Sequence, residues 1–123
     1  MRCPLLFATL LLVVSSSARA EVVDIRWSPD GRYTHEGTVP AGKFVEVCGK
    51  LPAGMKVQWE FEASAPVDFN VHYHVGKDVA FPTKLSAVVT ATDRLETKVE
   101  QDYCWMWTNK SSVPATLSVK LQR

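Results

Sequence analysis

Two histidines and a methionine are the side chains in this sequence best suited to hold a metal ion. His72 and His74 stand two residues apart in the segment FNVHYHV. On a β-strand that spacing points both imidazoles to the same side, about 7 Å apart. Imidazole binds zinc and copper, and a third ligand could come from Met106 or His35. The alternative is that both histidines lie on the solvated face of a sheet.

Met106 stands between Trp105 and Trp107 in the segment DYCWMWTNKS, residues 102–111. A thioether favours copper(I), and an indole ring can attract a cation. Because side chains alternate along a strand, however, both tryptophans face away from Met106 and Cys104. No histidine follows the cysteine closely, as a blue-copper site would require. We expect Cys104 and Met106 to face the core, with the tryptophan face either buried or exposed.

The residues that could serve an enzyme are few. No G-x-S-x-G sequence surrounds a serine, and no glycine-rich phosphate loop occurs. Glu60 and Glu62 share one strand face, but the routine explanation of such a pair is a solvated surface. A nucleophilic Cys104 would need a free thiol, which an oxidising compartment disfavours. We therefore expect a non-enzymatic protein.

Residues 1–20 predict a cleaved secretory signal peptide. Arg2 precedes an apolar run over residues 5–14, and Ala18-Arg19-Ala20 is a small-x-small cleavage site. A membrane anchor is the alternative, but the run is shorter than the roughly 20 apolar residues that a bilayer requires. We expect residues 21–123 to be a single exported domain, periplasmic or secreted, that does not span a membrane.

Two cysteines, Cys48 and Cys104, remain once the signal peptide is removed. In an exported chain of this size they most simply form one disulfide, worth about 4 kcal/mol in the chain-entropy model. A thiolate metal ligand and a nucleophile are the alternatives. The full chain has 14 basic and 13 acidic residues. These charges are scattered singly, whereas a nucleic-acid partner would call for clustered Lys and Arg.

Apolar and polar residues alternate along much of the chain, as they do on strands with one solvated face. Strands are predicted at residues 22–27, 44–48, 57–63, 69–75 and 116–122, with weaker candidates at 85–91 and 95–100. Turn residues stand between them at 28–31, 40–42, 52–54, 76–78, 81–82 and 113–114. Many short strands at this spacing predict an all-β fold, an antiparallel β-sandwich.

The segment GMKVQWEFEASAPVDFNVHYHV resembles the centre of a GOLD (Golgi dynamics) domain, in which a short polar turn separates two alternating strands. The aromatic strand over residues 103–109, which ends in Asn109, and the final strand ATLSVKL extend the likeness to about residues 38–121. The resemblance implies a jelly-roll-like β-sandwich of a class that binds proteins or lipids. Met106 stands where that family has a cysteine, and Cys104 lies two residues earlier on the same strand face. A Cys48–Cys104 bridge would therefore be displaced by two residues along the strand from the bridge of that family. The chain has no coiled coil or membrane span, and cargo-receptor function is not implied.

These patterns together predict a non-enzymatic binding or accessory module that contacts a protein or an apolar ligand. The aromatic residues expected to form its contact surface are Trp59, Tyr73, Trp105 and Trp107. The alternative is a periplasmic copper or zinc carrier that uses His72, His74 and Met106. The sequence Asn109-Lys110-Ser111 is also an N-glycosylation sequon, at a strand end that could accommodate a glycan; in a bacterial periplasm the sequon would have no meaning.

Overall fold

The computed structural model describes Leu12 and residues 20–123, so nearly all of the predicted signal peptide lies outside the described residues. The described part contains seven strands and no helix, and therefore no helix that could cross a membrane. The strands are β1 (Glu21–Asp24), β2 (Arg32–Val39), β3 (Phe44–Leu51), β4 (Lys56–Val75), β5 (Asp78–Glu96), β6 (Gln101–Thr108) and β7 (Ala115–Gln122).

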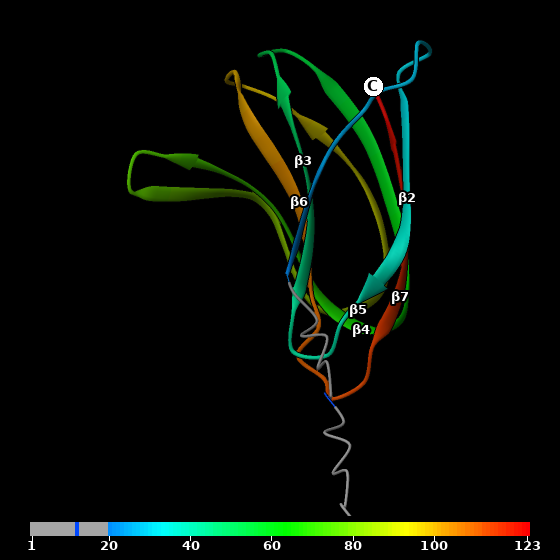
Figure 1. Cartoon of the computed structure of the whole chain (residues 1–123). Helices are drawn as coiled ribbons and strands as arrows, with labels where there is room; N and C mark the ends of the chain where they lie inside the picture. The colour runs from blue at the N-terminus through cyan, green and yellow to red at the C-terminus, as the bar shows by residue number, and fades with distance from the viewer. Residues whose placement is uncertain (1–11, 13–19) are drawn as a thin grey trace, which may run out of the picture.

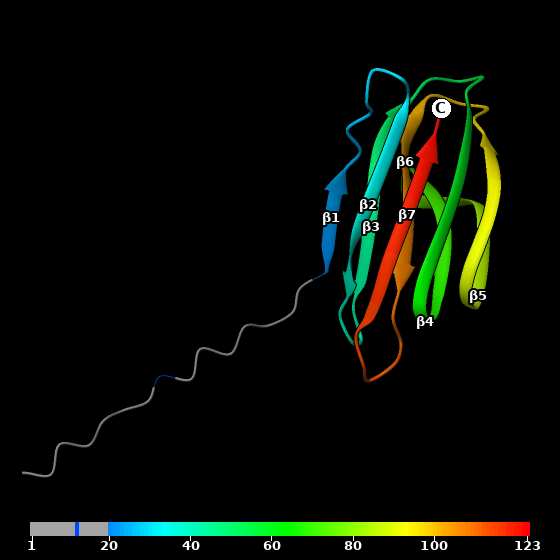
Figure 2. The same ribbon diagram turned by 90° about the vertical axis from the view of Figure 1, so that its right-hand side faces the viewer.

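The strands form two layers that share β4. The sheet order is β1-β3-β6-β4-β7-β2, with β5 paired to β4 along both of its halves. Residues 58–63 of β4 pair with β7, whereas residues 68–72 pair with β6. Figure 1 looks between the two layers, which β4 and β5 join by curving around one end. The predicted β-sandwich is confirmed, although β1 pairs with β3 in parallel rather than antiparallel (Figure 2).

The bend in β4 replaces the turn expected between two separate strands. The register between β4 and β5 shifts between Glu62 and Val67 of β4. Pro66 lies within this interval. Proline has no N–H to donate, so it fits a position where the ladder is interrupted. On β5, Ala87 takes a positive φ of 52° at the same bend, and its N–H donates to Asp68 Oδ1 at 3.0 Å. A bulge thus turns both strands without ending either of them.

Aromatic rings fill the space between the layers. Phe61, Phe69 and Trp107 contact one another with ring centroids 4.7 to 5.6 Å apart, and Trp59 packs 4.8 Å from Phe69. Trp105 and Trp107 have no exposed surface. Burying such rings removes more apolar area from water than burying a Met and a Cys would.

The expectation that Cys104 and Met106 face the core is therefore wrong. Because side chains alternate along β6, the burial of both tryptophans places Cys104 and Met106 on the outer face. The disulfide itself is confirmed. Cys48 and Cys104 are directly opposed on β3 and β6, and their sulfurs are bonded.

The structure differs from the predicted strands and turns at three other places. Strand β2 was not predicted, because RYTHEGTV has few apolar residues; its pairing along the whole of β7 makes it a strand. The segment Phe81-Pro82 lies inside β5 and is not a turn. The predicted strand at 95–100 extends only to Glu96, where β5 ends.

Asn109 joins four segments at one end of the sandwich. Its side chain is fully buried, and Nδ2 donates to the carbonyl oxygens of Val39 (3.1 Å) and Val113 (2.7 Å). Oδ1 accepts from the backbone N–H of Ser111 at 3.0 Å, and the backbone N–H of Asn109 donates to Lys43. The folded chain leaves no room for a glycan at this sequon, since Asn109 is buried and its amide nitrogen already donates both of its hydrogens.

We predict that Asn109→Ala lowers the free energy of unfolding by about 3 kcal/mol, because buried carbonyls at Val39 and Val113 lose their donor. Urea denaturation of the purified domain measures this change. The matched control is Gln58→Ala, which removes an exposed amide from β4 and should change stability by less than about 0.5 kcal/mol. Equal effects of the two substitutions would contradict the role assigned to Asn109.

Candidate functional site

The aromatic surface expected from the sequence is not present on the outside of the molecule. Trp59, Trp105 and Trp107 are buried in the core, so the expectation that they form an exposed contact surface is wrong. Their inward position follows from the alternation of side chains along β4 and β6, which places polar residues of β4 and both Cys104 and Met106 of β6 outside. Tyr73 differs from them: it is half-buried and its ring lies 5.1 Å from that of Tyr103.

The structure brings the predicted metal ligands to one surface, the outer face of the β3–β6–β4 layer. His72 lies opposite Cys104 across the β4–β6 pair, and Asn70 lies opposite Met106. Directly opposed residues share a face, so both histidines of β4 lie on the same side as Met106. The rings of His72 and His74 have their centroids 5.4 Å apart.

Glu46 completes this group, and sequence reasoning missed it. Its Oε2 lies 3.7 Å from Nε2 of His72, although β6 separates their two strands. Glu46 stands directly opposite Met106, in the row of the outer face next to Cys48 and Cys104. The only signal in the sequence was one polar residue in the alternating strand FVEVC, which does not reveal its neighbours.

Asn70 orients the buried imidazole. Its Oδ1 lies 2.7 Å from Nδ1 of His72. A carbonyl oxygen can only accept, so Nδ1 carries the hydrogen, and the lone pair of the neutral ring is on Nε2. Nε2 lies 3.7 Å from Oε2 of Glu46. The His72 side chain is only 8% exposed and that of Glu46 16%.

Burial shifts both groups toward their neutral forms. Removal from water lowers the pKa of His72, and the neighbouring His74 lowers it further. Removal from water raises the pKa of the Glu46 carboxyl, an effect that His74 opposes. A neutral imidazole can act as a metal ligand or a hydrogen-bond acceptor through Nε2.

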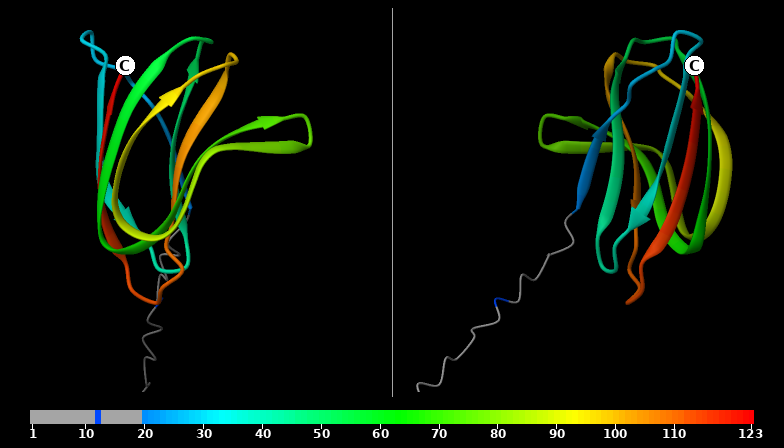
Figure 3. Two further views of the ribbon diagram at one scale, coloured as in Figure 1. Left: turned by 180° about the vertical axis from the view of Figure 1, so that it is seen from behind. Right: turned by 45° about the vertical axis from the view of Figure 1, so that its right-hand side comes forward.

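The last residues of β4 and the first residues of β5 form a hairpin that projects from the sandwich, as Figure 1 and both views in Figure 3 show. Val75 pairs with Asp78 across its turn, where Gly76 has a positive φ of 59°. Three apolar side chains of this projecting hairpin are exposed: Val75 (51%), Val79 (39%) and Phe81 (46%). Phe81 lies 6.1 Å from the His72 ring, so the hairpin continues the outer face that carries the histidines.

A groove of about 450 Å³ lies along the opposite side of the hairpin. Its lining combines Tyr73 and residues 80–83 of the hairpin with Tyr103 and residues 94–96 near the far end of β5. Tyr103 is held there by its hydroxyl, which donates to the carbonyl of Val99 at 2.8 Å. The projecting hairpin therefore has accessible surface on both sides.

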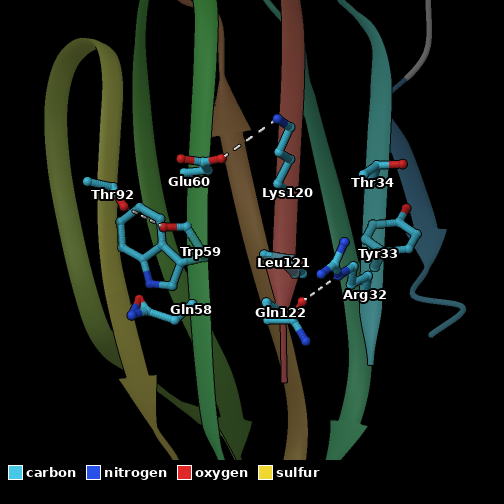
Figure 4. Close-up of a pocket in the computed structure, with 10 residues that line it drawn as sticks. All are labelled: Arg32, Tyr33, Thr34, Gln58, Trp59, Glu60, Thr92, Lys120, Leu121 and Gln122. Atoms are coloured by element: carbon cyan, nitrogen blue, oxygen red, sulfur yellow. Dashed lines mark hydrogen bonds and ion pairs between the residues drawn. The ribbon is translucent and has the colours of Figure 1, made fainter. Parts of the chain in front are cut away.

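A larger hollow of about 540 Å³ lies on the outside of the β2–β7–β4 layer (Figure 4). Its polar side chains pair with one another: Arg32 Nε donates to Gln122 Oε1 at 2.9 Å, and Lys120 lies 4.0 Å from Glu60. Trp59 contributes to its wall although its side chain is buried. We interpret this hollow as the solvated face of a sheet, which also accounts for Glu60.

No protein-family model and no curated protein matches the chain, so the resemblance to GOLD domains stays a prediction. Solved structures with a similar fold include the Aeromonas hydrophila PliG, a periplasmic inhibitor of g-type lysozyme (TM-score 0.55, 15% identity, 85% of this chain and 98% of that one). The Yersinia pseudotuberculosis-derived mitogen has a TM-score of 0.58 at 14% identity, and the match covers 74% of this chain and 84% of the mitogen. A mutant of the Escherichia coli PliG has a TM-score of 0.58 at 11% identity, and the match covers 85% of this chain and 98% of that one. At these identities the likeness shows the fold alone.

We predict opposite pH effects for substitutions of His72 and Glu46. The pKa of His72 is lowered in the folded chain, so the stability that its neutral form contributes is lost as the pH falls below about 6.5. The destabilisation caused by His72→Gln should therefore shrink as the pH falls through that range.

The pKa of Glu46 is raised in the folded chain, so the wild type loses stability as the pH rises from about 4.3 through the folded value. Glu46→Gln should therefore gain stability relative to wild type over that range. Urea denaturation of the three proteins between about pH 4 and pH 8 measures both trends. If the free energy of unfolding of either variant differed from that of wild type by the same amount at every pH, the pKa shift assigned to that residue would be contradicted.

Proposed function

We propose that this chain is an exported, non-enzymatic protein-binding module whose contact element is the projecting hairpin. The observation that carries the proposal is the exposure of Val79 and Phe81 on one face of the hairpin, with Val75 exposed on its other face, where no other strand of the described residues covers them. Such a hairpin buries little of its own apolar surface, and a group of exposed apolar residues is typical of a docking site.

The side chains of the hairpin suit a protein partner. Val79 lies opposite His74, and Phe81 lies near His72, so both apolar groups share the outer face. Lys84 Nζ lies 4.8 Å from the Phe81 ring centroid and supplies a cation at the edge of this patch. An aromatic anchor surrounded by polar groups is the usual composition of a binding hot spot.

The fold likeness supports both the compartment and the class of partner. Several proteins with this fold are periplasmic inhibitors, and their target is another protein, the g-type lysozyme. The predicted signal peptide and the disulfide are the features expected of an exported chain. The disulfide also supports a non-enzymatic role, because it leaves Cys48 and Cys104 without a nucleophilic thiol. A g-type lysozyme is therefore the first partner to test.

We predict that the domain binds a g-type lysozyme and that Phe81→Asp weakens this binding by about 10- to 100-fold, because a charge replaces the apolar anchor. Titration calorimetry measures the affinity, and a cell-wall lysis assay measures inhibition. The matched control is Val113→Asp, an equally simple change at a side chain that is 57% exposed and lies outside the hairpin.

Thermal unfolding of both variants checks that they fold. Wild-type affinity in Phe81→Asp would remove the hairpin as the contact element. Failure of the unaltered domain to bind the enzyme would remove g-type lysozyme as the partner.

A further inference from the structure

We propose that Glu46, His72 and His74 form a binding site for a divalent transition-metal ion of the zinc(II) or copper(II) class. The site lies on the outer face of the β3–β6–β4 layer and is independent of the protein-binding role proposed for the hairpin. It differs from the site expected from the sequence, because a carboxylate of β3 takes the place assigned there to Met106.

Two donor atoms, one on β4 and one on β3, lie at a distance that a metal ion can bridge. Nε2 of His72 and Oε2 of Glu46 are 3.7 Å apart, which is too long for a hydrogen bond. Two ligand atoms that each lie about 2.0–2.2 Å from a tetrahedral ion are roughly 3.4 Å apart. A shift of a few tenths of an ångström would therefore let one ion bind both atoms.

The imidazole is already held as a ligand requires. Asn70 accepts the hydrogen of Nδ1 at 2.7 Å, which fixes the ring and leaves Nε2, 3.7 Å from Oε2 of Glu46, as the nitrogen with a lone pair. Metal-ligating histidines usually donate their other ring N–H to a carboxylate or carbonyl oxygen in this way. Glu46 adds a carboxylate oxygen on the side of Nε2, so an imidazole nitrogen and an anionic oxygen lie side by side, which is a pairing that a divalent cation favours.

His74 supplies the third ligand. It lies two residues along β4 on the same face, with its ring centroid 5.4 Å from that of His72, and its side chain is exposed, so a change of rotamer would be needed to bring a ring nitrogen to the ion. The sulfur of Cys104 lies within 4.8 Å of the Glu46 and His72 ligand atoms, but it is bonded to Cys48 and cannot ligate as a thiolate.

The resulting set of two imidazoles and one carboxylate suits zinc(II) and copper(II), whereas copper(I) favours sulfur ligands. Met106 lies between Glu46 and Asn70 in one row across the outer face, whereas His72 lies in the neighbouring row beside Cys104. Its thioether is therefore placed for at most a weak additional contact, which would favour copper over zinc.

The test is a titration of the disulfide-bonded domain, stripped of metal with a chelator, with Zn(II) and with Cu(II). We expect one ion per chain by calorimetry and nitrogen coupling in the electron paramagnetic resonance spectrum of the Cu(II) form. Glu46→Gln and His72→Gln should each weaken binding by more than 10-fold, and Asn70→Ala by about 10- to 100-fold. The matched control is His35→Gln on β2, in the other layer, which should bind as wild type does.

A rise in the thermal unfolding midpoint on adding Zn(II), seen in wild type and His35→Gln but lost in Glu46→Gln, gives a second readout that does not depend on the copper spectrum. Circular dichroism establishes that the variants fold. The proposal is overturned if neither ion binds the wild type, which would leave a bridging water as the arrangement between the two atoms. It is equally overturned if Glu46→Gln and His72→Gln bind as tightly as His35→Gln does.

Discussion

Both layers of this molecule depend on a single continuous strand, β4, which pairs with β7 through its first half and with β6 through its second half. The bend near Pro66 makes this possible, because an interrupted ladder lets the strand change direction without a loop. Strand β5 follows the same path and takes the matching strain at Ala87. The two layers therefore cannot separate without breaking the pairing of one of these strands.

The aromatic core decides what the outer surface can do. Once Trp105 and Trp107 occupy the space between the layers, alternation along β6 requires Cys104 and Met106 to face outward. The same alternation along β4 places Phe69 inside and both Asn70 and His72 outside. The disulfide, the histidines and Glu46 thus share a surface as a consequence of where the large rings are buried, and the projecting hairpin extends this surface beyond the sandwich.

The two ends of the sandwich are closed by buried polar side chains. Asn109 ties the ends of β2, β3, β6 and β7 together through the carbonyls of Val39, Val113 and Lys43. At the other end, the Thr97 hydroxyl donates to the Pro52 carbonyl at 2.6 Å and accepts from the N–H of Met55 at 2.8 Å. Loop backbone cannot pair within the sheet, so these side chains satisfy groups that burial would otherwise leave unpaired. The hairpin, in contrast, exposes the side chains of Val75, Val79 and Phe81.

The sequence by itself determined the all-β class, the inward faces of residues 57–63 and 116–122, the inward positions of Phe69 and Val71, the turn at 76–78 and the pairing of Cys48 with Cys104. Each of these follows from alternation, from turn residues or from the small number of cysteines, which act over short distances or leave few alternatives. Only the tertiary structure decided which face of β6 is buried, because Trp105 and Met106 are both apolar and the choice depends on what lies opposite. It also decided the placement of Glu46 beside His72, since two strands that flank a third become neighbours through sheet order. Local pattern carries no information about that order.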